Sequence, residues 1–161
     1  MRTIYLSGGC FWGMEELFRA QEGVVNTEVG YTGGININPT YENHPGHADA
    51  LAITYDGNKT NYKNLLDFFF RIHDPTTLNR QGNDVGSSYR SAIFYQNEDE
   101  LKAAKEAIKK INDLKFYNNP VVTSLEKFTK FYSAEDYHQD YLQKNPNGYT
   151  CHFIRTDNHL I

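Results

Sequence analysis

The chain has 161 residues, which is enough for one domain with a hydrophobic core. Sixteen Lys and Arg residues against twenty Asp and Glu residues give a net charge of −4, and no basic cluster stands out. This balance argues against nucleic acid and anionic membrane surfaces as partners. No apolar run is long enough to cross a membrane, and the apolar stretch at the start is too short for a signal-peptide core. We therefore expect a cytoplasmic protein, and we expect it to be monomeric.

The first part of the chain predicts three strands and one helix. A strand is expected over residues 3–6, followed by a turn at two glycines, a helix over residues 11–21 and a second strand over residues 24–31. A polar segment, residues 36–49, comes next and is long for a loop without structure, which makes it a candidate functional segment. A third strand is expected over residues 50–55, where apolar and polar residues alternate.

The middle of the chain predicts a helix, a polar loop and a strand. Asn61 is a good helix cap, the apolar residues after it follow helical spacing, and Asp74-Pro75 ends the pattern. The loop is expected over residues 76–88 and the strand over residues 91–96.

The last part of the chain predicts a helix over residues 98–112, a strand over residues 121–128 and a helix over residues 133–143. Both helices begin with a capping-box signature. Strands and helices interleave irregularly along the whole chain. This pattern predicts an α+β two-layer sandwich, with helices packed on a mixed β-sheet.

Cys10 stands where the first strand gives way to the first helix. At a helix N-terminus a thiol faces unpaired backbone N–H groups and the positive end of the helix dipole, and both favour the nucleophilic thiolate. Phe11 and Trp12 follow, and Trp12 is the only tryptophan in the chain. The run predicts a reactive sulfur beside an apolar recess. From position alone, an inert buried cysteine is an equally good interpretation.

Other kinds of site have weaker support. The glycines before Cys10 lack the G-x-G-x-x-G and Gly-Lys-Ser/Thr patterns of phosphate-binding loops. His44, His47 and Asp49 would make a weak metal site, because all three lie in one loop with no cysteine nearby in sequence. A cysteine hydrolase that pairs Cys10 with His138 stays open on sequence grounds.

Several short motifs are more specific together than any of them alone. Gly9-Cys10-Phe11-Trp12-Gly13 resembles the signature of the peptide methionine sulfoxide reductase A family. Six further stretches resemble motifs of that family in the same order: residues 29–34, 38–41, 46–48, 80–86, 89–93 and 134–139. The resemblance covers nearly the whole chain and implies one catalytic domain over residues 1–161 with a ferredoxin-like core. It implies an enzyme that reduces the S epimer of methionine sulfoxide, free or within oxidised proteins.

The resemblance implies a chemical role for each cysteine. The Cys10 thiolate would attack the sulfoxide sulfur and be left as a sulfenic acid. Cys151 would attack that sulfenic acid and form a disulfide, which thioredoxin or dithiothreitol would reduce. No metal or organic cofactor is implied. Gly148 and the irregular pattern around it predict a tail mobile enough for Cys151 to reach Cys10.

The resemblance also implies roles around the substrate. Phe11 and Trp12 would form a recess for the methyl group of the substrate. Tyr41 and Tyr89 would hold the sulfoxide oxygen through their hydroxyl groups, where negative charge develops. Asp84 would support these groups by orienting the tyrosines or a water molecule.

This chain departs from the family at the residue that would act as the acid. The family usually has a glutamate in a Gly-His-Ala-Glu string, whereas this chain has Gly46-His47-Ala48-Asp49. A carboxyl group that donates a proton at neutral pH needs apolar surroundings, which raise its pKa. The shorter side chain of Asp49 must then sit closer to the substrate or act through a water molecule. The alternative is a binding module that recognises oxidised methionine but turns it over poorly.

Overall fold

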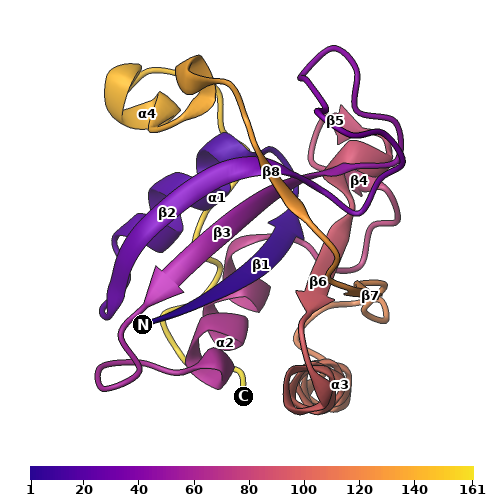
Figure 1. Ribbon diagram of the computed structural model, residues 1–161. Helices are drawn as coiled ribbons and strands as arrows, with labels where there is room; N and C mark the ends of the chain where they lie inside the picture. Colours follow the sequence, from indigo (N-terminus) through magenta and orange to yellow (C-terminus); the bar gives the residue numbers. More distant parts are fainter.

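The computed structural model describes residues 1–161. The fold is organised around a six-stranded mixed sheet (Figure 1). The strands follow the order β7-β6-β1-β3-β2-β8, and β6 and β7 pair in parallel. In chain order the strands are β1 (Arg2–Gly8), β2 (Val24–Thr32), β3 (Ala48–Tyr55), β6 (Ser91–Tyr95), β7 (Ser124–Lys127) and β8 (Phe131–Ser133). A separate two-stranded ribbon consists of β4 (Arg80–Gln81) and β5 (Asp84–Val85).

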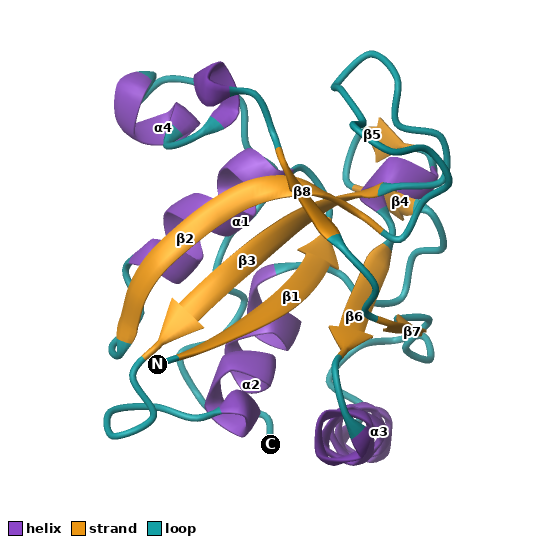
Figure 2. Cartoon of the chain, viewed as in Figure 1, coloured by secondary structure: helices purple, strands orange, loops and turns teal.

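Two helices, α1 (Phe11–Arg19) and α2 (Tyr62–Ile72), cover one face of the sheet (Figure 2). The long helix α3 (Glu98–Leu114) packs beside α2 and β6, and the short helix α4 (Tyr141–Lys144) packs on α1. The chain order β1-α1-β2-β3-α2-β6, with the spatial order β6-β1-β3-β2, is the ferredoxin-like arrangement. The α+β class, the mixed sheet and the ferredoxin-like core are therefore confirmed.

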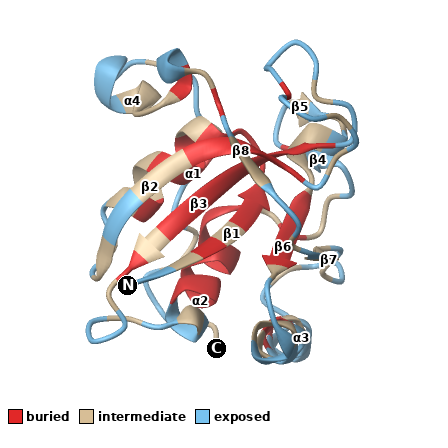
Figure 3. Ribbon diagram, viewed as in Figure 1, coloured by how far each residue is buried: buried red, intermediate tan, exposed pale blue.

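The apolar core lies between the sheet and the helices α1 and α2. Leu51 and Ile53 of β3 are fully buried there, together with Phe18 of α1 and Phe69 of α2. β3 is paired on both sides, with β1 and β2, and nearly all of its residues are buried (Figure 3). None of the helices combines the length and apolarity that crossing a membrane would need.

Two of the predicted helix starts are confirmed by side-chain caps. The Asn61 side chain accepts a hydrogen bond from the backbone N–H of Asn64, at the start of α2. The Asn97 side chain accepts one from the backbone N–H of Glu100, at the start of α3. Each cap satisfies a backbone donor that the helix itself leaves unpaired, so these ends could be located from sequence.

The helix predicted over residues 133–143 is wrong. The segment instead holds a 3₁₀ turn, Asp136–His138, then Asp140 in the left-handed region at φ 55°, then the single turn α4. Tertiary partners impose this shape. The Gln139 side chain hydrogen-bonds both the N–H and the carbonyl of Val29, and Glu15 of α1 accepts the backbone N–H of Asp140.

Two other predictions need smaller corrections. The loop predicted over residues 76–88 contains β4, β5 and a 3₁₀ turn, Ser87–Tyr89. The strand predicted over residues 121–128 is shorter, because β7 spans only Ser124–Lys127. β4 and β5 pair with each other across a tight turn, whereas β7 pairs with β6, about thirty positions earlier, and residue type alone specifies neither pairing.

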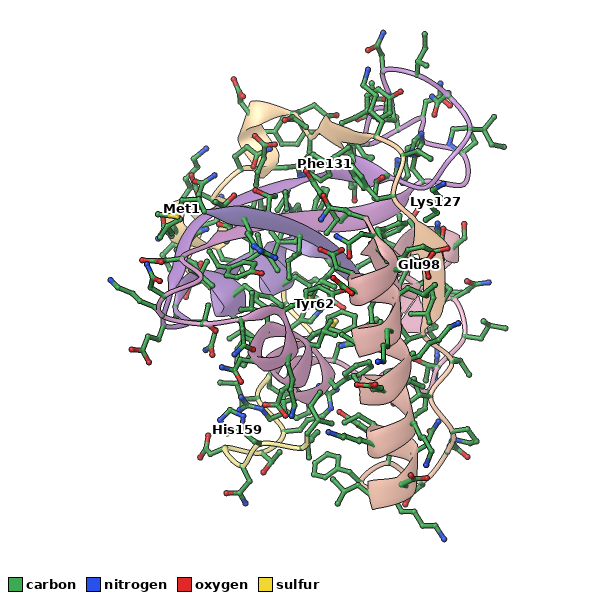
Figure 4. All side chains as sticks on the ribbon, turned by 60° about the horizontal axis from the view of Figure 1, so that its bottom comes forward. Met1, Tyr62, Glu98, Lys127, Phe131 and His159 are labelled. Carbon is green, nitrogen blue, oxygen red and sulfur yellow. The ribbon has the colours of Figure 1, made fainter.

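The C-terminal tail has no helix or strand after α4, yet it is fastened at several points. Imidazole Nε2 of His152 lies 2.6 Å from the carbonyl oxygen of Gly8, and the backbone N–H of Arg155 donates to the carbonyl of Arg71. Farther along, the buried carboxylate of Asp67 in α2 lies 2.9 Å from Nδ1 of His159, which is labelled in Figure 4. Polar contacts therefore hold the tail along the helical side of the sheet in this structure, and its mobility stays a prediction.

Candidate active site

The topology gathers the candidate residues at one end of the sheet. Gly8, at the end of β1, pairs with Ser91 at the start of β6, and β3 runs antiparallel to β1 and so begins at this same end. Cys10 follows β1, Asp49 is the second residue of β3, and Tyr89 comes just before β6. Three segments that are distant in sequence therefore place a thiol, a carboxyl group and a phenol together.

Cys10 is the N-cap residue of α1, and its side chain is nearly enclosed, with the residue 8% exposed. Gly9 makes the turn possible, because it adopts φ +94° and a side chain there would collide with Gln81. Cys10 is a free thiol, as is Cys151. The predicted placement of the sulfur at the strand-to-helix turn is therefore confirmed.

The expected stabilisation of the Cys10 thiolate is wrong for this resting structure. Burial raises the pKa of Cys10 well above its ordinary value, and the hydrogen bond from the backbone N–H of Trp12 offsets only part of that rise. The negative charges of Asp49 and Asp84 raise the pKa further. The cost of removing a charged sulfur from water outweighs the attraction of the helix N-terminus, so the thiol keeps its proton.

Asp49 has the environment of a proton donor. It is 2% exposed, and burial raises its pKa to about 8, although a hydrogen bond from the backbone N–H of Phe11 acts in the opposite direction. Its Oδ1 lies 4.0 Å from Nε2 of His44, and its Oδ2 is buried with no hydrogen-bond partner. A carboxyl group with this pKa is largely protonated at neutral pH and can donate from an oxygen that nothing else occupies.

The two predicted tyrosine hydroxyls lie together. Burial raises the pKa of both residues overall, although the Tyr89 side chain lies close enough to Tyr41 to act in the opposite direction on the pKa of Tyr41. Tyr41 belongs to the loop between β2 and β3, is 39% exposed, and donates its backbone N–H to the Glu135 carboxylate over 3.0 Å. The Asp49 charge raises the pKa of both tyrosines, which places all three groups within electrostatic reach of one another. Both phenols therefore keep their protons and can donate hydrogen bonds.

Asp84 and Cys151 form a second group beside the first. Asp84 accepts a hydrogen bond of 3.3 Å from the hydroxyl of Tyr149, so its partner is this tail residue and neither of the predicted tyrosines. Cys151 is half-buried, and its sulfur lies 3.8 Å from the carbonyl oxygen of Gln81. A negative charge on Cys151 would raise the pKa of Cys10, which places the two thiols within electrostatic reach of each other.

The two aromatic residues after Cys10 are placed differently from each other. Phe11 is 1% exposed and belongs to the core, where its ring packs 5.7 Å from Tyr31 and 5.2 Å from His138. Trp12 is partly exposed and stacks on Tyr141 with ring centroids 3.7 Å apart. Trp12 can present a face to a substrate directly. The recess that Phe11 and Trp12 would form for a methyl group stays a prediction.

The geometry of His138 contradicts the hydrolase alternative. The indole N–H of Trp12 donates to Nδ1 of His138 over 3.0 Å. Because an indole is only a donor, Nδ1 must be the unprotonated nitrogen and Nε2 must carry the hydrogen. Burial also lowers the pKa of His138. The ring therefore offers no free lone pair to take a proton from Cys10.

The loop histidines are committed to other partners. Nδ1 of His47 accepts the backbone N–H of Gly34 over 3.0 Å, and its Nε2 faces the carbonyl of Asn36. No group of three or more His, Cys, Asp or Glu side chains is arranged to hold a metal ion. His44 and His47 therefore shape the loop around Asp49.

Sequence reasoning missed the roles of two residues that shape the site. Glu135 accepts the hydroxyl of Tyr31 through one oxygen and the backbone N–H of Tyr41 through the other. His44 stacks on Tyr31 with ring centroids 4.8 Å apart and contacts the hydroxyl of Ser88 over 2.7 Å, beside Tyr89. Glu135 lies in the stretch 134–139, which resembles a family motif, and its charge could have singled it out there. No sequence signal connects His44 with Ser88.

Comparisons with known proteins agree with this geometry. A family model described as peptide methionine sulfoxide reductase matches residues 2–160. Peptide methionine sulfoxide reductase MsrA of Nocardia farcinica is 54% identical over 156 residues, covering 97% of this chain and 92% of its own length. The protein of that name from Mycobacterium sp. (strain JLS) is 57% identical over 152 residues, covering 94% and 89%.

Solved structures extend the likeness to three dimensions. Mxr1 from Saccharomyces cerevisiae in reduced form has a TM-score of 0.89 and 36% identity, covering 96% of this chain and 92% of that one. Mxr1 in complex with Trx2 has a TM-score of 0.66 and 27% identity, covering 96% and 90%. This chain, an oxidoreductase built around a buried thiol and a neutral carboxyl group, therefore belongs to the peptide methionine sulfoxide reductase family.

Proposed function

We propose that this protein reduces the S epimer of methionine sulfoxide, free or within oxidised proteins, through the thiol of Cys10. Cys10 attacks the sulfoxide sulfur while Asp49 donates a proton to the departing oxygen. The hydroxyls of Tyr41 and Tyr89 hold that oxygen, and Trp12 with Phe11 faces the methyl group. Family membership supports the reaction class, and the arrangement of the side chains supports the roles.

One observation carries the proposal. Asp49 is buried within electrostatic reach of Cys10, and one of its oxygens has no partner within the protein. Leaving a buried polar atom unpaired costs about 1–3 kcal/mol, so such an atom in a family of enzymes points to a partner that arrives with the substrate. A sulfoxide oxygen is a strong acceptor and suits a protonated carboxyl group.

The raised pKa values of Cys10 and Asp49 fit a reaction that starts from two neutral groups. As the sulfur of Cys10 bonds to the sulfoxide sulfur, the thiol proton leaves toward the carboxyl group while that group protonates the oxygen. The S–O bond of the substrate then breaks, and its oxygen ends on Cys10 as a sulfenic acid. The substrate sulfur is reduced to the thioether and the Cys10 sulfur is oxidised, so the step balances without a cofactor.

The second half of the cycle uses Cys151. Its thiol attacks the Cys10 sulfenic acid, a disulfide forms, and water leaves. A dithiol protein such as thioredoxin then reduces the disulfide. The complex of Mxr1 with Trx2, a thioredoxin, supports this type of reductant. The neighbourhood of the two free thiols supports Cys151 as the resolving group.

The test incubates the protein with each epimer of methionine sulfoxide and with dithiothreitol, and measures the methionine that forms. We expect the S epimer to be consumed and the R epimer to persist. Cys10→Ser should produce no methionine while its circular dichroism spectrum is unchanged. Methionine formation by Cys10→Ser would contradict the nucleophile, and binding of sulfoxide without turnover by the native chain would favour a binding module.

A further inference from the structure

His152 lies next to the backbone turn that carries Cys10 and next to the thiol of Cys151. The residue is 7% exposed and follows Cys151 directly. A side chain at Gly13, one turn beyond Cys10, would overlap the His152 ring, and Nε2 of His152 approaches the backbone at Gly9. The imidazole therefore packs against the turn that carries Cys10, and its Nδ1 is the ring nitrogen near the Cys151 sulfur.

The hydrogen bonds of His152 fix which nitrogen carries the proton. Nε2 lies 2.6 Å from the carbonyl oxygen of Gly8, which is only an acceptor, so Nε2 must hold the hydrogen. Nδ1 is then the unprotonated nitrogen of a neutral ring. Nδ1 lies 3.9 Å from the sulfur of Cys151, a distance at which a thiol hydrogen can be shared.

We propose that His152 takes the proton of the Cys151 thiol when this sulfur attacks the oxidised Cys10, and passes it to the departing hydroxyl group. The proposal rests on the function given above, in which Cys151 resolves the sulfenic acid. The S–H bond of Cys151 and the S–O bond of Cys10 break, the S–S bond forms, and the proton leaves with the hydroxyl as water. One sulfur is oxidised and the other reduced, so no further reagent is needed.

The surroundings of Cys151 explain why a proton acceptor is needed. Burial and the charge of Asp84 raise the pKa of Cys151, so its thiol is protonated at neutral pH. The other acceptor near its sulfur, the carbonyl oxygen of Gln81 at 3.8 Å, can share a hydrogen bond but cannot take the proton. Burial lowers the pKa of the His152 ring to about 4, so Nδ1 is unprotonated at neutral pH and holds the proton only in passing, as it moves on to the departing hydroxyl group.

The charged and titratable groups around Cys151 and His152 come from the tail itself, from the β5 ribbon and from the helices α1 and α2. Tyr149 and Arg155 lie on the same tail, and the neighbouring Tyr149 side chain and the charge of Arg155 both lower the pKa of Cys151. Asp84 comes from the β5 ribbon, Cys10 from the start of α1, and His73 from the end of α2. The charge of Arg155 favours negative charge on the Cys151 sulfur as its proton leaves, whereas the charge of Asp84 opposes it.

The experiment separates the two chemical steps. The reduced protein is mixed with one equivalent of methionine sulfoxide and no reductant, and methionine, free thiols and dimedone-trapped sulfenic acid are followed in time. His152→Gln keeps a donor for Gly8 but removes the proton acceptor. We expect this variant to form methionine at the native rate and to lose its thiols about 100-fold more slowly at neutral pH, with sulfenic acid accumulating.

A pH profile distinguishes proton transfer from mere support of the tail. In His152→Gln the rate of thiol loss should rise about tenfold per pH unit, because only the thiolate fraction reacts. In the native chain it should change little over the same range. The matched control is His73→Gln, which removes a buried imidazole on another side of Gly8 without touching either thiol. It should keep the native pH profile.

Three outcomes would overturn the inference. The His152→Gln variant could lose its thiols at the native rate, or lose them more slowly by the same factor at every pH. The third is a rate of thiol loss in the native chain that rises tenfold per pH unit. The last measurement needs no variant and so does not depend on its folding. The Cys151→Ser variant tests the proposed function separately from the role of His152. If this variant turns over repeatedly with thioredoxin as reductant, or if the native chain forms no methionine, it is the proposed function that fails.

Discussion

The indole of Trp12 is hydrogen-bonded to the imidazole of His138, with 3.0 Å between Nε1 and Nδ1. The indole is also stacked on Tyr141, so both its edge and one face are held by the segment that follows β8. An aromatic wall fixed in this way loses little rotamer freedom when a ligand binds against it. The relationship explains why the irregular segment around His138 belongs to the site.

Trp12 should therefore report substrate binding through its fluorescence, since it is the only tryptophan. In Cys10→Ser, which cannot react, addition of methionine sulfoxide should shift or quench the emission in a saturable way. His138→Phe should change the emission of the free protein, because the indole N–H loses its acceptor. If the emission stays constant while calorimetry detects binding, Trp12 does not line the substrate site.

Asp49→Asn should slow methionine formation by about 100-fold or more and change substrate binding much less, because it removes the proton donor. In the native chain the rate should fall as the pH rises through about 8, where Asp49 loses its proton. Stopped-flow measurement of the first turnover between pH 6 and pH 10 checks both. A native rate that is flat across this range would assign the proton to another group.

The same group makes a prediction about stability. The pKa of Asp49 is about 8 in the folded chain and close to the ordinary 3.8 in the unfolded chain, so the unfolded chain releases this proton first. Its contribution to the free energy of unfolding is complete below about pH 4 and is lost as the pH rises toward 8. Asp49→Asn should therefore gain stability relative to the native chain between pH 5 and pH 8, as urea unfolding would show.

Tyr41→Phe and Tyr89→Phe should each lower the rate of the first turnover, because each removes a donor to the sulfoxide oxygen. Losing one such donor typically costs about 100-fold or more. The double variant should be slower than either, but by less than the product of the two effects, since the two side chains lie beside each other and act on one oxygen. Full multiplication of the two effects would contradict a shared role.

His73 should make the protein sensitive to acid. The ring is fully buried between the carbonyl of Phe69 and the hydroxyl of Ser91, and burial lowers its pKa from 6.5 to about 3. The neutral ring favours the folded state, so stability is complete above about pH 6.5 and is lost as the pH falls toward 3. His73→Gln should reduce this loss by up to about 1.4 kcal/mol per pH unit. An unchanged slope in acid unfolding would contradict the buried neutral ring.

Asp67→Asn should loosen the tail without affecting the first chemical step. Its carboxylate receives Nε of Arg71 at 2.9 Å and the backbone N–H groups of Leu160 and Ile161. Breaking such a buried ion pair costs about 3 kcal/mol or more. We expect the melting temperature to fall while the first equivalent of methionine forms at the native rate. Lys109→Ala, which removes an exposed ion pair with Asp113, is the control and should change stability little.

The sequence alone located most of the fold. The strand-to-helix turn at Cys10 and the caps at Asn61 and Asn97 depend on local chemistry, and these features were confirmed. The segment after β8 could not be predicted, because the left-handed residue Asp140 is held by Glu15, more than a hundred positions away. A capping-box signature depends only on residues within one segment. It cannot predict a hydrogen bond to a carboxylate on another helix.

The sequence by itself determined which atoms can react: two thiols, a carboxyl group and the phenols, in the order of a known family. Only the tertiary structure decided their state. Burial keeps the Cys10 thiol and Asp49 protonated. The packing also commits the lone pair of His138 to Trp12 and places His152 against the turn of Cys10 and beside the Cys151 sulfur. Protonation depends on how much water and charge surround a group, and those surroundings exist only when distant segments have packed together.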